Sequence, residues 1–485
     1  MTSLSKESPA LHMENVDNGN SNTPVGHDVE KEKKLVRKLD CVILPWVMLM
    51  YLLSYMDRSN FGNVREIGLE QDLELTPTLY EWASATFYIG TVLFGTIGGL
   101  MLKVVPPSTW LAGCLVGWGA MSTLQASCTN AAGLITLRFF LGVFEASFAP
   151  GCALYLSFWY LKSELSLRIA AYAGMSALSG VISGLVAYGL GAADGLLIES
   201  WQAVFIIEGL PTVLCGVLTF WILPGQPEAG RSHWFSEDEY QIILQRRTRF
   251  VRNQDDGIKL SQVKGAFLDY RLYLFAFIYS GLSLSLAVMS VFLPTIVATL
   301  GYESVKANLM TAPAYASAYV CLLLTAHLSD RTRLRGAPVA VGGFIAGTGY
   351  VLLGLLHEHR ARYASAFLAV VGTYMAYPIV LAWIPSTFGG DTKSGVGVGV
   401  VIAVGHAVGI AASYIYPKNQ APQYFMGNVV SSVLTFTTAI AAIAMSLLLY
   451  LENRSRDRRY GKPEVDCSID MGADADGNPS YRYDI

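Results

Sequence analysis

The chain has 485 residues, of which 53% are hydrophobic and only 15% are charged, and its formal net charge is −3. A soluble globular protein carries charge on about 25% of its residues, so the deficit argues against a soluble protein and favours one that is covered largely by lipid. The near-neutral net charge also argues against a nucleic-acid partner, which would require a strongly basic surface.

Residues 1–30 come first and are polar, rich in Asn, Ser and Asp. They lack the apolar run of a signal peptide, and their composition predicts a disordered cytoplasmic tail. The first membrane segment is therefore expected to serve as the targeting signal as well.

Twelve apolar segments follow, each about long enough to cross a bilayer as a helix. Six lie near 41–61, 81–103, 108–129, 131–158, 168–191 and 201–223. After a polar stretch, six more lie near 271–297, 306–329, 337–356, 361–385, 393–416 and 427–451. The pattern predicts an all-α membrane protein with 12 transmembrane helices in two pseudo-symmetric six-helix bundles, residues 31–223 and 271–452.

Lys and Arg gather in the predicted loops on the side of the N-terminus. The positive-inside rule makes that side cytoplasmic and places both termini there. The linker, residues 224–270, contains the stretch WFSEDEYQIILQRRTRF, in which Ser236 and Glu239 form a capping box. It predicts an amphipathic helix at the membrane surface. Residues 453–485 are predicted to be a second disordered cytoplasmic tail.

Charged residues inside membrane spans are costly and usually face a cavity or a partner. The first span ends in Asp57-Arg58, and the fourth carries Arg138 and Glu145. Seven helical steps place Arg138 and Glu145 on one stripe but about 10 Å apart, too far to pair with each other. We therefore expect two contacts between spans, Asp57 with Arg138 and Arg58 with Glu145. A carboxylate that loses its arginine binds a proton more readily, which can tie a proton to a conformational change.

Each of these positions also has a simpler interpretation. Asp57-Arg58 could cap the first span at the membrane interface. Glu208, in FIIEGLPTV, is more typical of an anchoring hydrogen-bond acceptor. His406, in the middle of the eleventh span, could face the cavity or pack against a neighbour.

Six plus six helices with a long cytoplasmic linker resemble the major facilitator superfamily. The stretch HLSDRTRLRGAPV (327–339) resembles the loop motif of that superfamily, which implies an interdomain charge relay of Asp330, Arg331 and Arg335. The stretches RFFLGVFEASFAPGCALYLSFWYLKSELSLRIA and YPKNQAPQYFMGNVV are similar to one branch, the fungal allantoate permease group of the anion:cation symporter family.

Bacterial sugar-acid symporters of that family place proton-linked carboxylates on helices 1 and 4, each beside an arginine. The resemblance therefore implies that Asp57 and Glu145 couple transport to protons. Substrate-binding candidates are the arginines and aromatic residues near them and on other spans: Arg58, Arg138, Tyr55, Tyr88 and His406.

The expected function is proton-coupled uptake of a small organic anion by alternating access, at the plasma membrane. We expect a monomer that needs no cofactor, because the proton gradient supplies the energy. Two alternatives remain open, an exporter of a secondary metabolite and a non-transporting nutrient receptor. An enzyme is not expected, because the sequence has no P-loop, zinc signature or nucleophile elbow.

Overall fold

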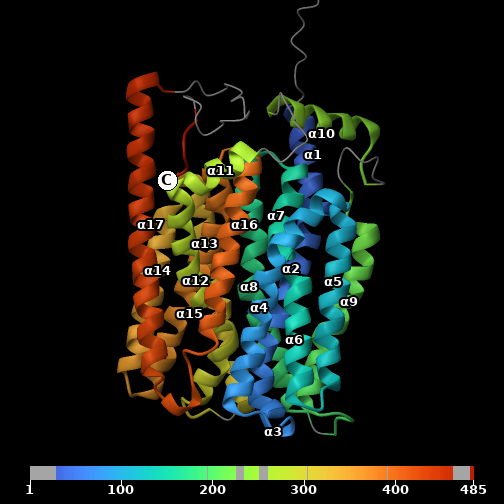
Figure 1. The fold of residues 1–485 in the computed structure, drawn as a ribbon, viewed down its shortest axis with the longest axis vertical. Helices are drawn as coiled ribbons and strands as arrows, with labels where there is room; N and C mark the ends of the chain where they lie inside the picture. The colour runs from blue at the N-terminus through green and yellow to red at the C-terminus, as the bar shows by residue number, and fades with distance from the viewer. Residues whose placement is uncertain are drawn as a thin grey trace, which may run out of the picture.

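The computed structural model describes residues 29–193, 195–225, 234–250, 260–302, 304–389, 391–462 and 481–485. Over these residues the regular structure is entirely helical. Long helices run side by side along the long axis of the molecule, with α1 and α10 at one end and α3 at the other (Figure 1). We call these the α10 end and the α3 end.

The described residues of the first half form nine α-helices: α1 (Val29–Val42), α2 (Leu44–Val64), α3 (Glu70–Asp72), α4 (Pro77–Val104), α5 (Pro107–Leu124), α6 (Ala131–Glu145), α7 (Phe148–Trp159), α8 (Lys162–Gly191) and α9 (Ser200–Ile222). Short π- and 3-10 helices, η1 (Arg65–Leu69) and η2 (Gln125–Ser127), follow α2 and α5. The predicted fourth span is divided between α6 and α7. Pro150 explains the break, because its ring would clash with the carbonyl group of Ala146 in a continuous helix.

The linker forms α10 (Glu237–Phe250) and α11 (Leu260–Leu268). The predicted capping box is confirmed: Glu239 N donates to Ser236 Oγ at 3.3 Å, and Ser236 N donates to Glu239 Oε2 at 2.9 Å. Lys38 Nζ lies 2.7 Å from Glu239 Oε2 and joins α10 to α1.

The second half contains α12 (Tyr270–Ala298), α13 (Ser304–Thr332), α14 (Gly336–Leu355), α15 (His359–Thr387), α16 (Asp391–Ala412), η3 (Lys418–Gln420) and α17 (Phe425–Tyr460). The six predicted spans of this half coincide with the six α-helices. The last helix, α17, continues to Tyr460, past the predicted boundary at residue 452.

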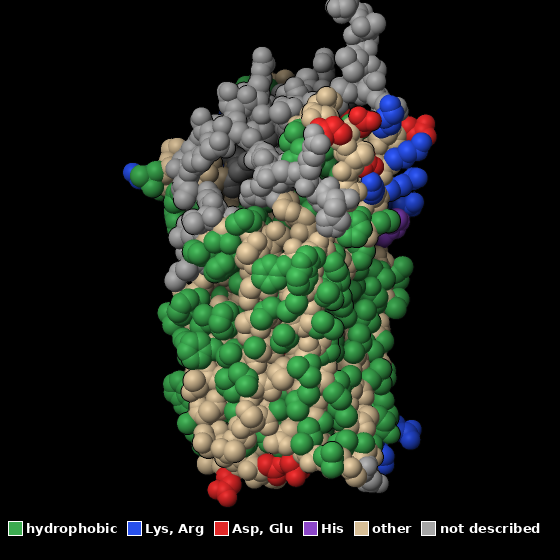
Figure 2. All heavy atoms as spheres, turned by 90° about the vertical axis from the view of Figure 1, so that its right-hand side faces the viewer, with side chains coloured by type: hydrophobic (Ala, Val, Ile, Leu, Met, Phe, Trp, Pro, Cys, Tyr) green, Lys and Arg blue, Asp and Glu red, His purple; other side chains and the backbone are tan. Residues whose placement is uncertain are grey.

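Ten helices in the described part of the chain are long and apolar enough to cross a membrane. Figure 2 shows hydrophobic side chains over the middle of one face, with the charged side chains gathered at its two ends. Helices α4 and α5, which coincide with the predicted second and third spans, are not among the ten. The chain is therefore a multi-pass membrane protein, and the count of twelve spans stays a prediction.

The two halves repeat one packing scheme. In the first half α5 packs on α9, α2 on α8 and α4 on α6; in the second half α14 packs on α17, α12 on α16 and α13 on α15. The halves meet where α8 packs on α13 and where α4 packs on α16. These two interfaces correspond to each other under the same pairing, and the halves also meet where α15 packs on α8 and α12 on α2.

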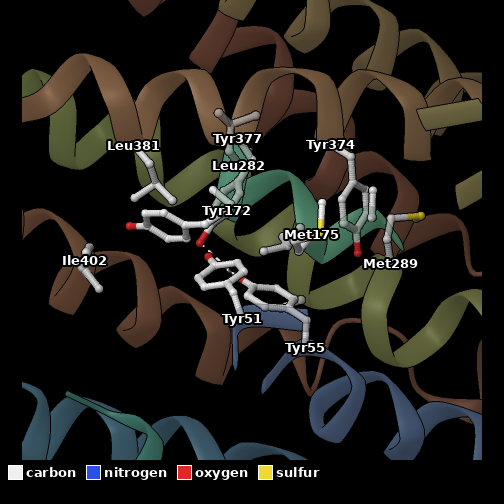
Figure 3. Close-up of a cluster of buried hydrophobic side chains, with 14 of the residues drawn as sticks. Tyr51, Tyr55, Tyr172, Met175, Leu282, Met289, Tyr374, Tyr377, Leu381 and Ile402 are labelled. Carbon is white, nitrogen blue, oxygen red and sulfur yellow. Dashed lines mark hydrogen bonds between the residues drawn. The ribbon is translucent and has the colours of Figure 1, made fainter. Parts of the chain in front are cut away.

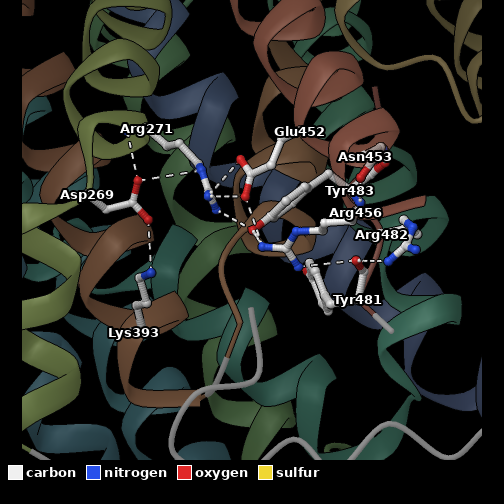
Figure 4. A network of polar contacts seen from close by, with 9 residues as sticks. All are labelled: Asp269, Arg271, Lys393, Glu452, Asn453, Arg456, Tyr481, Arg482 and Tyr483. Atoms are coloured by element: carbon white, nitrogen blue, oxygen red, sulfur yellow. Dashed lines mark hydrogen bonds and ion pairs between the residues drawn. The ribbon is translucent and has the colours of Figure 1, made fainter. Parts of the chain in front are cut away.

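The last residues, Tyr481–Ile485, lie at the α10 end of the second half (Figure 1), where Tyr481, Arg482 and Tyr483 join a network of polar contacts (Figure 4). Arg271 Nη1 donates to Tyr483 Oη at 2.8 Å, and Asn453 holds the backbone of Tyr483 with two hydrogen bonds of 2.9 and 3.0 Å. Asp269, next to Arg271, pairs with Lys393 at 2.9 Å. This network ties α12, α16 and α17 together at that end.

Candidate functional site

Asp57 and Arg58 lie well inside α2, not at its end. The helix continues to Val64, and the side chains of Asp57 and Arg58 are buried, with 0% and 8% of their surface exposed. A cap at the membrane interface, the simpler interpretation of this pair, does not describe their position.

Arg58 and Glu145 form the predicted contact between α2 and α6. Arg58 Nε donates to Glu145 Oε1 at 2.6 Å, and Arg58 Nη2 lies 2.6 Å from the same oxygen. Ser54 Oγ, one turn earlier on α2, also donates to that oxygen at 2.6 Å. The second oxygen, Oε2, is buried and makes no hydrogen bond among the described residues. Glu145 is the last residue of α6, so the break before α7 fixes the place of this carboxylate.

The other predicted contact, between Asp57 and Arg138, is wrong. Asp57 instead accepts hydrogen bonds from Ser122 Oγ at 2.5 Å and from Thr212 Oγ1 at 3.2 Å. The physical reason is that α5 and α9 pack closely on this side of α2 and bring two hydroxyl groups to the carboxylate.

Arg138 is buried over aromatic rings. Its guanidinium carbon lies 4.1 Å from the ring centre of Phe61 and 5.3 Å from that of Phe87. Its Nε and Nη1 atoms are buried and make no hydrogen bond to any described residue. Phe87 also lies 5.1 Å from the guanidinium carbon of Arg58, so this ring stands between the two arginines. Sequence reasoning missed Phe87, because one phenylalanine in an apolar span carries no distinguishing signal.

A small cavity, with room for about one water molecule in this conformation, lies between the two halves. Four of the predicted substrate-binding residues line it: Tyr55, Arg58, Tyr88 and His406. The second half contributes further lining residues that the sequence did not single out: Ser283, Leu286, Ala287, Ser290 and Tyr377. Arg138 is not among the lining residues, and it lies behind Phe87 in this conformation.

Tyrosine side chains of the two halves meet beside the cavity, and Figure 3 shows Tyr51 and Tyr55 of the first half near Tyr377 of the second. The hydroxyl oxygen of Tyr377 lies 3.0 Å from that of Tyr55 on α2 and 3.0 Å from that of Tyr279 on α12. Tyr51 lies one turn from Tyr55, and their hydroxyl groups are 3.4 Å apart. Tyrosines in the middle of otherwise apolar predicted spans were the available signal for Tyr279 and Tyr377.

The residues of the predicted interdomain relay lie at the junction of α13 and α14. Arg335 forms an ion pair with Asp330, and the backbone N–H of Arg335 donates to the carbonyl group of Ile485. Arg331 is exposed. The chain terminus thus occupies part of this loop.

Residues 47–414 match the Major Facilitator Superfamily. The chain is similar to the MFS transporter prlL of a fungal species (strain NRRL 50135), at 32% identity covering 93% of both chains. It is also similar to the high-affinity nicotinic acid transporter of Saccharomyces cerevisiae, at 29% identity covering 93% of this chain and 85% of the other. Among solved structures, a D-xylose-proton symporter superposes with a TM-score of 0.64 at 15% identity, covering 83% of this chain and 96% of that one.

Proposed function

Because the chain belongs to the Major Facilitator Superfamily and is a transporter rather than an enzyme, we propose that it takes up a small organic anion together with protons, by alternating access. We place it in the fungal allantoate permease-like branch of the anion:cation symporters. The α10 end is then cytoplasmic, both termini are inside, and a monomer acts in the plasma membrane. The high-affinity nicotinic acid transporter among its relatives has a carboxylic acid in its name, which fits this substrate class.

The observation that carries the proposal is the buried charge cluster beside the cavity. With both carboxyl groups ionised, Asp57 and Glu145 balance the two positive charges of Arg58 and Arg138, so the buried cluster is neutral without a substrate. An anion adds one negative charge to a site where an uncompensated charge is costly. One proton restores neutrality, and this charge balance couples the binding of the anion to the binding of a proton.

Glu145 is the residue we assign to that proton. Its Oε2 atom is buried and without a hydrogen-bond partner, so it can take up a proton without breaking an existing contact. Protonation weakens the attraction between Glu145 and Arg58 and frees the guanidinium of Arg58 to bind a carboxylate in the cavity. Movement of Phe87 would then bring the free N–H groups of Arg138 to the same anion.

Closure at both ends supports alternating access. The hydroxyl contact between Tyr377 and Tyr55 joins the halves on one side of the cavity, and Tyr279 holds the Tyr377 hydroxyl group from within the second half. Toward the α3 end, Thr295 Oγ1 on α12 donates to Glu66 at 2.6 Å, and Asn308 Nδ2 on α13 donates to the backbone oxygen of Asn63 at 3.3 Å. Opening one set of contacts while the other holds would expose the site to one side at a time.

A thermal-shift screen of the purified protein tests the substrate class. Nicotinate and nicotinamide form a matched pair, because they share a ring and differ in charge. A ligand at about a hundred times its Kd stabilises a protein by about 2.7 kcal/mol. We expect stabilisation by nicotinate or another monocarboxylate, greater at acidic pH, and none by the matching amide. Equal stabilisation by acid and amide would contradict an anion site.

A further inference from the structure

We propose that Glu208 on α9 is a second proton-binding residue, which exchanges its proton with Asp57 inside the first half of the protein. The inference rests on the proton coupling proposed above, and it adds a site that lies apart from the substrate cavity.

Glu208 is a buried carboxyl group with unused hydrogen-bonding capacity. Its side chain is 1% exposed, and neither of its oxygens makes a hydrogen bond to a described residue. Asn60 and Ser183 lie close enough to interact with it, but neither reaches hydrogen-bond geometry, and Asn60 is fully buried with neither amide atom bonded to a described residue. Buried polar groups normally find partners, so two unpartnered groups that face each other call for an explanation.

A proton on Glu208 supplies that explanation. A carboxylic acid can donate its O–H to the amide oxygen of Asn60 while its other oxygen accepts from the amide N–H. An ionised carboxylate cannot donate, and it would leave the amide oxygen of Asn60 unsatisfied. The neutral acid is also favoured by burial, because an unpaired charge in this environment is costly.

The register of two helices places this group beside Asp57. Asp57 and Asn60 lie one turn apart on α2, and Thr212 and Glu208 lie one turn apart on the antiparallel α9. The hydroxyl group of Thr212 lies 3.2 Å from Asp57 Oδ2 and 3.1 Å from the backbone oxygen of Glu208. Because Thr212 opposes Asp57, the next turn brings Asn60 opposite Glu208. The four side chains form one continuous polar strip between the helices.

Among the described residues of the surrounding elements, Asp57 is the charged group close enough to interact electrostatically with Glu208. Helix α9 packs against α2, α5, α8, η1 and η2, and neither α5 nor η2 contains a charged residue. The described charged side chains of α2, α8 and η1 are otherwise engaged: Arg58 with Glu145, Arg65 with Glu70, Glu66 with Thr295, Glu164 with Arg246 and Arg168 with Asp40. Two neighbouring carboxylates resist ionising together, so one proton shared by Glu208 and Asp57 is the expected arrangement.

This strip does not border the substrate cavity, since none of its residues lines that cavity. On the α3 side, the strip continues to Asn63 Nδ2, which donates to Ser183 Oγ at 2.9 Å. A proton held here would therefore not compete with the substrate for space.

Infrared difference spectroscopy of the full-length protein in liposomes tests the proposal without a known substrate. A protonated carboxyl group has a carbonyl stretch distinct from that of a carboxylate. We expect a buried carboxylic-acid band that changes between about pH 5 and about pH 8, is lost in Glu208→Gln, and is shifted in Asp57→Asn. The exposed Glu199→Gln, at the start of the same helix, should retain the band.

The inference would be overturned if Glu208→Gln retained the band, or if the band did not change with pH. If Glu208→Gln does not fold, Glu208→Asp keeps the carboxyl group and must shift the band instead of removing it. Uptake of a monocarboxylate that stabilises the purified protein is measured in parallel, for the wild-type protein under a pH gradient. Wild-type uptake that ignores pH refutes the proposed function, whereas pH-driven uptake without the Glu208 band refutes only the second proton site.

Discussion

Removing one partner of the Arg58–Glu145 pair should lower the free energy of unfolding more than removing both partners. Arg58→Met would leave Glu145, which is 2% exposed, as a buried carboxylate without its cation. Removing one partner of a buried ion pair costs about 3–5 kcal/mol. Glu145→Leu should cost a similar amount, because it strands the guanidinium group of Arg58.

The double variant Arg58→Met, Glu145→Leu removes the pair as a whole. Replacing a buried ion pair by apolar residues is often neutral or stabilising by about 1–4 kcal/mol. We therefore expect the double variant to be about as stable as the wild type but inactive in transport. Ser54→Ala, which removes a single hydrogen bond to Glu145, serves as the control and should cost about 1 kcal/mol.

The assay is the free energy of unfolding in bicelles, measured for the four proteins of this double-mutant cycle together with the control. Because each single variant is expected to lose about 3–5 kcal/mol and the double variant almost nothing, the expected coupling energy is roughly 6–10 kcal/mol in magnitude. Additive losses would refute the reasoning, because they would show that neither charge depends on the other. A stable double variant that still transports would refute the role of the pair in transport.

Three further predictions concern the two closures and the chain terminus. Tyr377→Phe removes hydroxyl contacts to both halves, each worth about 1 kcal/mol, and should increase cysteine labelling of the cavity from the α10 end. Gly62→Val places a side chain against the backbone of Val291 on α12, so it should hold the α3 end open and abolish transport. Gly189 has open space around it, so the control variant Gly189→Val should retain transport. Burial raises the pKa of Asp484, and two nearby arginines only partly oppose this, so the docked terminus binds more protons than the free one. Docking of the terminus should therefore weaken as the pH rises from about 4 through the raised pKa. Hydrogen exchange of Tyr481–Ile485 measures this.

Most of the long helices could be predicted because each is a largely apolar run of membrane length. The sequence did not place the break between α6 and α7, although Pro150 was visible, because proline inside a membrane helix can also be accommodated by a kink. The first linker helix, α10, was predictable from local chemistry alone, since a capping box involves only neighbouring residues, whereas α11 was not predicted.

The candidate site was predictable in its charges but not in its contacts. Charged residues inside apolar spans are few, so Asp57, Arg58 and Glu145 stood out from the sequence. Their partners depend on the rotation and register of helices that are far apart in the chain. Ser122 and Thr212, which hold Asp57, look like ordinary small polar residues in a membrane helix, and only packing brings them to the carboxylate.

Proton uptake on substrate binding is the measurement that tests the central claim most directly. The purified protein in weakly buffered solution is mixed with a monocarboxylate that stabilises it, and the pH change is followed with an indicator dye. The charge balance of the buried cluster predicts uptake of about one proton per bound anion in the wild type, and none in Glu145→Gln. Anion binding without proton uptake in the wild type, or equal uptake in the variant, would contradict the account.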